Sequence, residues 1–588
     1  MSLTDTNLFT FITVISKMKW MTPKKILFLI LAIASFFRLW GISRVPVSLF
    51  GDELDVGYHA YSILKTGKDY SGNSWPIHFQ SLAEWRTPLY LYSAVPTVAL
   101  FGISPLGVRF PAAIFGILGV YALFLLVREL TKDENIGVLA ASVLAFSPWH
   151  IQYSRAAFEV TQLLFLLILG LYFFFKSLKD GKWLWVSAGL LTLTPWVYST
   201  AKLFTPILLV FLLLTWRKEI LSLSKKYLIW AAIALFIVGT PIAYSTLFGG
   251  GTQRFGYISI FTDPTIRPEV GVARERDARV RGEMGVGLKP RVTDKLIHNK
   301  FTLWGSFIIK NYFEAFSTDF LFIKGDPNPR HSIGMGEFHK VEAIALILGL
   351  IFFLTRFKDR KIKFFILFWV LAGVVPAAIT REGGNHATRL ILILPPLVFL
   401  ISYGLAEAYR GLKGNLRYIL TAIYLIAFLL GFIAYQHNFW VHYPWESERW
   451  WHAGFKEAIQ TIKQIDKDYD RVIISTANEP PWIFFAGWSE YSPQDWHQGF
   501  PMKGTYIDGF GGVSYIDKYY FGAFDEKGVT IYDLPKYITD KDIYLAVAKE
   551  IGWNLIREPE KTPPGVKLVK AIAYPSGEPA FYLLTKSD

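Results

Sequence analysis

The stretch FGDELDVGYH, residues Phe50–His59, places three carboxylates and a histidine shortly after the first long apolar segment, residues 26–42. An apolar segment of that length is typical of a transmembrane helix, so the stretch is expected to lie where the chain leaves the membrane. Ionisable side chains are costly beside a bilayer unless they have a function. We therefore interpret Asp52 as a catalytic base at the membrane surface, with Glu53 as the second catalytic carboxylate, which orients Asp52 or the acceptor.

The composition favours a polytopic membrane protein over a soluble one. Of the 588 residues, 52% are hydrophobic and 18% are charged, and several apolar runs are long enough to cross ~30 Å of hydrocarbon. The net charge of +14 comes mainly from Lys and Arg in short loops between these runs, where basic residues set topology, so we expect no nucleic-acid partner. The absence of cysteine excludes disulfides, thiolate nucleophiles and Cys-ligated zinc.

The apolar runs predict about eleven transmembrane helices. One shorter run, residues 89–103, decides the orientation of all that follow. If it lies on the outer surface, the basic short loops face the cytoplasm, whereas five of them face outward if it crosses. We therefore expect that it does not cross. The spans after residues 26–42 are predicted at residues 106–127, 136–149, 161–175, 183–197, 203–216, 228–247, 341–355, 364–379, 390–409 and 418–435.

This topology predicts a mainly α-helical protein of three parts in the plasma (inner) membrane. A cytoplasmic N-terminal segment, residues 1–25, precedes a transmembrane domain, residues 26–435, and a soluble extracytoplasmic α/β domain, residues 436–588. The transmembrane domain has a catalytic first outer loop and a long outer loop, residues 43–105 and 249–340. In the last part, helical periodicity covers residues 451–465, and strands are predicted at residues 471–475, 531–532 and 581–584.

Polar clusters that topology does not explain all fall on the predicted outer face, which suggests a reaction site there. They include Asp52, Glu53, Asp55, His59, Arg86, Arg109, Arg155, Glu159, Arg330, His331, His386 and Arg389. Simpler alternatives stay open. The i, i+4 spacing of Asp55 and His59 suits either a metal site or a helix ion pair. Arg155 and Glu159 share that spacing and could form a local salt bridge, and Arg109 could anchor a span. We assign no metal ligand and no certain cofactor, and a divalent cation stays an open alternative.

Three motifs resemble those of a known family. They are Phe50-Gly51-Asp52-Glu53, RTPLYLY at Arg86–Tyr92, and GVRFPAAIFG at Gly107–Gly116. Together they look like the polyprenyl-phosphate-sugar-dependent glycosyltransferases of the GT-C fold. That group includes the dolichyl-phosphate-mannose protein mannosyltransferases and the lipid A aminoarabinose transferases.

The resemblance implies a GT-C membrane domain and a role for several residues. Asp52 matches the catalytic acidic position of the first outer loop. Arg86 stands where a basic residue meets the donor phosphate, and Arg109 where a functional arginine opens the second span. Glu159 occupies a position where some relatives have aspartate. The residues assigned to substrate binding are Arg86, Arg109, Arg155, Glu159, His386 and Arg389.

The expected chemistry fits these residue types. A polyprenyl-phosphate sugar leaves as a phosphate and needs no protonation, so one base that deprotonates the acceptor hydroxyl is enough. Arginines can neutralise the departing phosphate. We expect an inverting hexosyl- or pentosyltransferase that uses a dolichyl- or undecaprenyl-phosphate-type donor and a protein, lipid or glycan acceptor among membrane lipids. The alternatives are an oligosaccharyltransferase-like enzyme with a pyrophosphate-linked glycan, or a polytopic lipid or sugar transporter, which would need charges within the spans.

Overall fold

The structure is a computed structural model that describes residues 22–82, 84–283, 289–476, 479–499, 506–507, 510–511, 515–524 and 528–587. Most of the predicted cytoplasmic segment, residues 1–25, lies outside the described residues. The chain forms two compact units, each built from separate stretches of sequence. The helical unit comprises Met1–Ala34, Ile117–Gln152 and Leu163–Ile433. The α/β unit comprises Ser35–Gly116, Tyr153–Gln162 and Ala434–Asp588.

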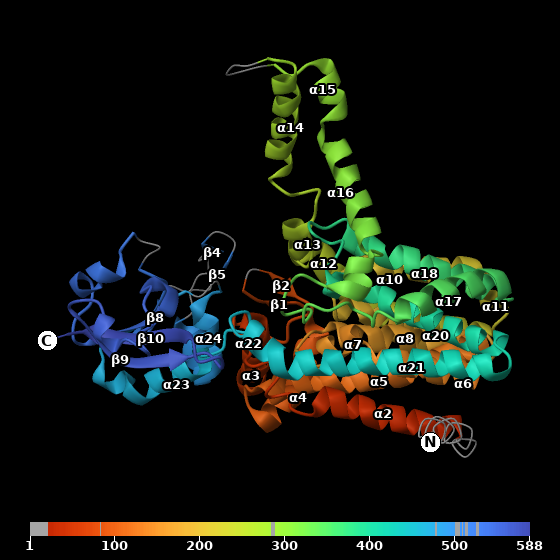
Figure 1. Cartoon of the computed structure of the whole chain (residues 1–588), viewed down its shortest axis with the longest axis horizontal. Coiled ribbons are helices and arrows are strands. Elements are labelled where there is room, and N and C mark those ends of the chain that lie inside the picture. The colour runs from red at the N-terminus through yellow and green to blue at the C-terminus, as the bar shows by residue number, and fades with distance from the viewer. Residues whose placement is uncertain are drawn as a thin grey trace, which may run out of the picture. The chain divides into compact units, whose positions relative to one another are not determined.

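A helix stands at each of the eleven predicted spans, which confirms the mainly helical, polytopic fold (Figure 1). Six helices of the described chain are long and apolar enough to cross a membrane: Pro105–Thr131 (α5), Val160–Ser177 (α8), Lys225–Phe248 (α12), Arg360–Ala378 (α18), Ala387–Gly411 (α19 to α20) and Gly414–Glu446 (α21 to α22). The other predicted spans contain shorter helices: α2 (Pro23–Leu39), α6 (Glu134–Phe146), α9 (Leu184–Leu193), α10 (Ser199–Thr215) and α17 (Glu342–Arg356).

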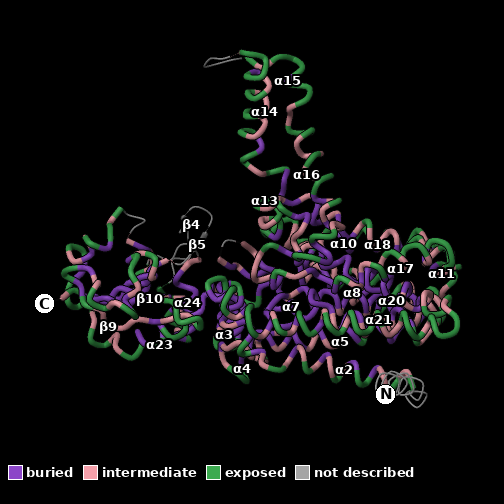
Figure 2. The backbone as a smooth tube through the Cα atoms, viewed as in Figure 1, coloured by how far each residue is buried: buried purple, intermediate pink, exposed green. Residues whose placement is uncertain are grey.

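Burial differs sharply among the long helices (Figure 2). Ala387–Gly411 is 89% buried in its most apolar window, whereas Lys225–Phe248 is only 11% buried. Exposed leucine, isoleucine and phenylalanine side chains on α12 suit contact with lipid, because a surface of that kind would be unfavourable in water.

Helices α17 and α20 (Leu394–Gly411) pack backbone to backbone at two glycines. A Cβ atom on Gly349 would lie 2.0 Å from the carbonyl oxygen of Leu400, and one on Gly404 would lie 2.3 Å from that of Ala345. Small residues at a helix interface permit this close approach in membrane proteins.

The segment predicted to be the long outer loop, residues 249–340, contains several helices. Helices α14 and α16 lie side by side and project from the rest of the helical unit (Figure 1). Its elements are α13 (Gln253–Ile258), α14 (Ile266–Val280), α15 (Val292–Ile297), α16 (Lys300–Glu314) and the π-helical turn η4 (Asp319–Ile323).

The α/β unit contains a six-stranded mixed sheet of order β6-β7-β3-β8-β10-β9. Strand β3 runs parallel to β7 and β8, and β10 is antiparallel to β8 and β9. The strands are β3 (Arg471–Ile474), β6 (Tyr515–Ile516), β7 (Tyr519–Phe521), β8 (Asp542–Val547), β9 (Val566–Ala573) and β10 (Pro579–Lys586). The strands predicted at residues 471–475 and 581–584 are therefore confirmed.

Two local predictions in this unit need correction. Residues 531–532 do not form a strand but begin the 3-10 helix η9 (Ile531–Lys536), in which Ile531 and Leu534 are buried one turn apart. Helix α23 (Phe455–Ile465) begins later than predicted. His452 and Gly454 have φ of 50° and 91°, a left-handed conformation that a right-handed helix cannot contain.

The segment predicted to be the first outer loop, residues 43–105, packs into the same hydrophobic core as the C-terminal segment. It forms helix α3 (Gly51–Thr66), the hairpin β1 (Phe79–Gln80) and β2 (Trp85–Arg86), and helix α4 (Pro88–Phe101). Helices α24 (Pro481–Ser489) and α25 (Pro493–Gly499) pack on α3. A terminal methyl group of Leu54 lies 2.8 Å from where a Cβ on Gly487 would be, so a larger residue at 487 would force Leu54 to shift. Residues 436–588 therefore share one hydrophobic core with α3, and a second cluster, which includes Leu534 and Tyr544, lies entirely within residues 436–588.

Candidate active site

Asp52 lies in the first turn of α3, and its side chain is exposed. A residue far away in the sequence fixes this turn, because the Gly51 backbone N–H donates to Glu479 Oε2 at 2.8 Å. A Cβ on Gly51 would lie 2.2 Å from that oxygen, so a larger residue there would displace the Glu479 side chain. The Asp52 carboxylate accepts no hydrogen bond from any residue that the structure describes.

Glu53 points the other way, into the protein, and only 1% of it is exposed. Its carboxylate accepts from Arg109 Nε at 2.8 Å, from Arg109 Nη2 at 2.7 Å and from the Ala157 N–H at 2.8 Å. The remaining N–H groups of Arg109 donate to the carbonyl oxygens of Ile42, Pro46 and Ser48 at 3.0, 2.8 and 2.5 Å. All five guanidinium N–H groups are thus used within the protein. The predicted catalytic role of Glu53 and the predicted contact of Arg109 with a phosphate stay predictions.

Arg86, at the end of β2, lies among three acidic residues. Its Nη1 donates to Asp55 Oδ2 at 2.8 Å and to the Asp52 carbonyl oxygen at 3.1 Å. Its Nη2 is 3.7 Å from Glu159 Oε1, beyond hydrogen-bond distance. Burial acts to lower the pKa of Arg86, but Glu159, Asp55 and Asp52 together raise it, so the guanidinium stays charged. At this distance Nη2 and Glu159 form an ion pair without a hydrogen bond, and the predicted contact of Arg86 with a donor phosphate stays a prediction.

Asp55 and His59 meet in a buried cluster beneath Arg86. Asp55 Oδ1 accepts from the Tyr70 hydroxyl at 2.7 Å and lies 3.5 Å from His59 Nε2. Burial alone would raise the pKa of Asp55, but His59, Arg86 and the hydroxyls of Tyr70 and Ser81 hold it below its usual value. Burial lowers the pKa of His59, although the charge of Asp55 acts to raise it. Among the described residues, no third His, Asp or Glu completes a metal site with this pair.

Arg155 and Glu159 do not form the local salt bridge that their spacing permits. Arg155 instead donates to the carbonyl oxygens of Phe37, Trp40 and Val45 at 2.8, 2.8 and 2.9 Å. Its guanidinium also lies over the rings of Phe439 and Trp440, at 5.2 and 4.9 Å from their centroids. The side chain thus holds the segment after α2, and its predicted contact with substrate stays a prediction.

His386 and Arg389 lie in the helical unit and line a cavity of about 520 Å³. Arg389 Nη1 donates to Thr380 Oγ1 at 2.9 Å and to the Arg381 carbonyl oxygen at 2.7 Å. Burial and the nearby charges of Arg389 and His331 hold the pKa of His386 well below its usual value. Asp326 also lines this cavity and was not among the predicted site residues. Its only sequence signal was the nearby polar pair that includes His331.

Comparison with known proteins places this geometry in context. Residues 86–244 match the family model described as dolichyl-phosphate-mannose-protein mannosyltransferase. The crystal structure of ArnT from Cupriavidus metallidurans bound to undecaprenyl phosphate matches with a TM-score of 0.51 at 12% identity, over 94% of this chain and 97% of that one. The chain has the GT-C fold. The predicted GT-C resemblance is therefore confirmed at the level of fold.

Two further similarities to this GT-C chain are more limited. A candidate mannosyltransferase named YkcB, from Bacillus subtilis (strain 168), is 27% identical over 143 residues. The match spans 23% of this chain and 20% of the relative, so it covers about a fifth of that protein. The apo oligosaccharyltransferase of Archaeoglobus fulgidus matches with a TM-score of 0.47 at 13% identity, over 80% of this chain and 63% of that one.

Proposed function

We propose that this protein is a membrane-embedded glycosyltransferase that transfers a sugar from a polyprenyl-phosphate donor to an acceptor hydroxyl, with inversion. The observation that carries the proposal is the contrast between Asp52 and the acids next to it. Glu53 and Asp55 are buried against Arg109 and Arg86, whereas the Asp52 carboxylate is exposed and accepts no hydrogen bond within the described chain. Asp52 is thus the group that can take a proton from an acceptor.

Arg86 supplies the second part of the proposed reaction. A sugar phosphate ester that is attacked at the anomeric carbon releases a phosphate, whose negative charge an adjacent guanidinium stabilises. Arg86 is already held near Asp52 by its hydrogen bond to the Asp52 carbonyl oxygen, while its Nη2 makes no hydrogen bond to Glu159. This arrangement supports a donor phosphate placed beside the base.

The matches to known proteins support the choice of donor. The family model that matches residues 86–244 is one of mannosyltransferases that use dolichyl-phosphate mannose, and the ArnT structure holds undecaprenyl phosphate. We take these as support for a lipid-phosphate sugar, with a hexose as the first sugar to test. In the proposed setting, the N-terminus is cytoplasmic, and Asp52 acts on the outer face of the plasma membrane.

The test is sugar transfer by purified Asp52→Asn. Asparagine keeps the size of the side chain but cannot accept the proton, so turnover should fall by ~10²–10⁴ while donor affinity is retained. In the assay, purified protein is mixed with membranes that do not contain this protein and is given radiolabelled undecaprenyl-phosphate mannose. Transfer is measured as the label that leaves the donor and appears in other fractions.

Asp495→Asn is the matched control, because Asp495 is also an exposed aspartate in the first turn of a helix of the same unit. Its turnover should equal that of the unmodified protein. Near-normal turnover in Asp52→Asn would remove Asp52 as the base, and no transfer by the unmodified protein would reject this donor.

A further inference from the structure

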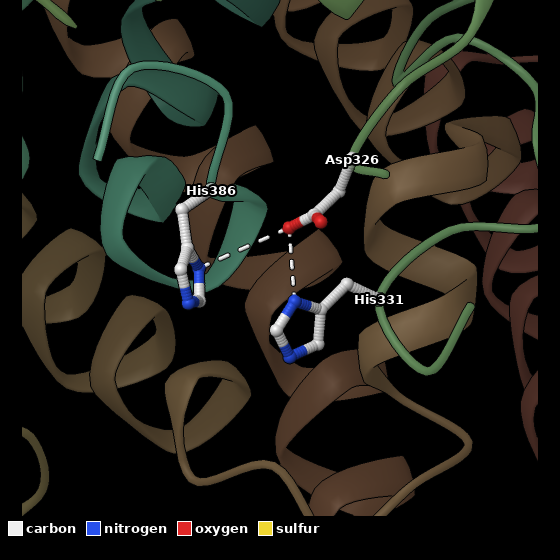
Figure 3. Close-up of side chains that lie close together, drawn as sticks. All are labelled: Asp326, His331 and His386. Atoms are coloured by element: carbon white, nitrogen blue, oxygen red, sulfur yellow. Dashed lines mark hydrogen bonds and ion pairs between the residues drawn. The ribbon is translucent and has the colours of Figure 1, made fainter. Parts of the chain in front are cut away.

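Three potential metal ligands converge in the helical unit. Asp326, His331 and His386 all line the cavity of about 520 Å³, and their ligand atoms lie within 4.8 Å of one another. Figure 3 shows both imidazole rings turned toward one carboxylate oxygen of Asp326. We propose that these three side chains bind a divalent transition-metal ion of the Zn²⁺ class.

The spacing of the donor atoms suits one ion. Zinc ligands at ~2.0–2.2 Å from the metal in a tetrahedral site lie about 3.4 Å from one another. Asp326 Oδ2 is 2.9 Å from His331 Nδ1 and 3.8 Å from His386 Nδ1, which brackets that value. The ligand nitrogens of the two imidazoles lie within 4.8 Å of each other, so ring rotations that bring them to about 3.4 Å apart would complete the site.

The backbone around Asp326 is fixed before any ion binds. Asp326 Oδ1 accepts from the Asn328 N–H at 2.8 Å, and the Asp326 N–H donates to Glu337 Oε1 at 3.0 Å. The preceding Gly325 has φ of 73°, and a Cβ there would lie 2.3 Å from the Met335 carbonyl oxygen. A loop held this tightly can bind an ion without an ordering cost, which favours affinity.

The two histidines reach Asp326 from different parts of the chain. His331 lies in the same loop, whereas His386 precedes helix α19 (Ala387–Leu390). The Ala387 N–H donates to Asp326 Oδ2 at 2.7 Å, which fixes the distance between the two segments. This hydrogen bond uses one lone pair of Oδ2, and a bound ion would take the second lone pair in place of the present hydrogen bond with His331 Nδ1.

A hydrogen-bond network without metal explains only part of the cluster. The Asp326–His331 contact is a good hydrogen bond by itself. His386 Nδ1, however, is buried and makes no hydrogen bond, and a buried polar atom without a partner costs about 1–3 kcal/mol. An ion bound between the three side chains would give this nitrogen its partner.

The ligand set indicates the class of metal. Two imidazoles and one carboxylate favour zinc-type ions over Mg²⁺ or Ca²⁺, which prefer all-oxygen sites. Three protein ligands leave at least one coordination position, as in zinc sites that bind water or a substrate oxygen. The inference does not depend on the proposed sugar transfer, because it uses only residues of the helical unit.

The experiment uses the full chain, purified in detergent, stripped with a chelator and titrated with Zn²⁺ by calorimetry. We expect one tight Zn²⁺ per chain, a rise in melting temperature on binding, and little competition from Mg²⁺. Loss of an outer-shell partner alone costs 10–100-fold in metal affinity, so removing a ligand in His386→Ala or Asp326→Asn should cost about 100-fold or more. His386→Ala leaves the hydrogen bonds of Asp326 to Asn328 and Ala387 in place, so it decides the question if Asp326→Asn does not fold.

The control is His442→Ala. His442 and His437 form an exposed pair with their Nε2 atoms 3.2 Å apart, a second place where Zn²⁺ could bind weakly. Tight binding should survive in His442→Ala. Tight binding that is lost in His442→Ala but kept in His386→Ala would overturn the proposal, as would the absence of tight binding in the unmodified chain.

Discussion

Replacement of Arg109 by methionine tests whether this arginine stabilises the fold or binds a donor phosphate. The change removes five donated N–H groups and leaves Glu53 buried, with the Ala157 N–H as its one remaining donor among those described above. Removing one partner of a buried ion pair costs about 3–5 kcal/mol, because the other charge stays desolvated. For a unit of this size, such a loss lowers the melting temperature by on the order of 10 °C.

Thermal unfolding of the purified protein in detergent measures this loss, and a second substitution identifies its cause. In the double variant Glu53→Gln/Arg109→Met the buried charge is gone, so part of the lost stability should return. Arg449→Met is the control, since Arg449 is an exposed arginine of the same unit, and its effect should stay within about 0.5 kcal/mol. The reasoning fails if Arg109→Met melts like the unmodified protein while its affinity for a polyprenyl-phosphate sugar falls.

Two other substitutions test the buried acid cluster and the helix packing. The pKa of Asp55 lies below its usual value, so its charge stabilises the fold above about pH 4 and this contribution fades as the pH falls further. Between about pH 6 and pH 3, the melting temperature should therefore fall more steeply in the unmodified protein than in Asp55→Asn, and parallel curves would contradict this. Gly404→Ala should cost about 1–3 kcal/mol, because the new Cβ meets the Ala345 carbonyl oxygen. Gly271→Ala in α14, where a Cβ meets nothing within 4 Å, should be neutral or stabilise by about 0.5–1 kcal/mol, and equal losses in both variants would exclude the packing explanation.

Much of the helical architecture could be predicted because hydrophobic length alone identifies transmembrane segments. The basic residues of the short loops kept residues 89–103 out of the count of spans, and most of these residues form α4 in the α/β unit. The motif around Asp52 could also be recognised. Which of two adjacent acids faces outward could not be predicted, because α3 is buried almost all round and its sequence shows no clear polar face.

Long-range ionic partners left no signal in the sequence. Glu53 and Arg109 are 56 residues apart, and Asp326 lies 61 residues from Ala387. Sequence periodicity reports only neighbours on one helix or strand. It could not show that Arg155 would donate to backbone carbonyl oxygens, or that Glu159 would pair with Arg86 instead. It also could not show that Asp326 would meet His386.

The packing of α3 against residues 481–499 has a consequence for how the protein is made. The Tyr58 hydroxyl donates to the carbonyl oxygen of Tyr491, 433 residues further along the chain. At translation rates of 5–20 residues per second, roughly 20–90 s separate the synthesis of these two partners. During that interval residues 481–499, which pack on α3, have not yet been made. A ribosome-bound chain therefore cannot yet hold α3 and Asp52 in their final positions. Co-translational folding of this unit must therefore wait for its last segment, and a prematurely released chain would be inert.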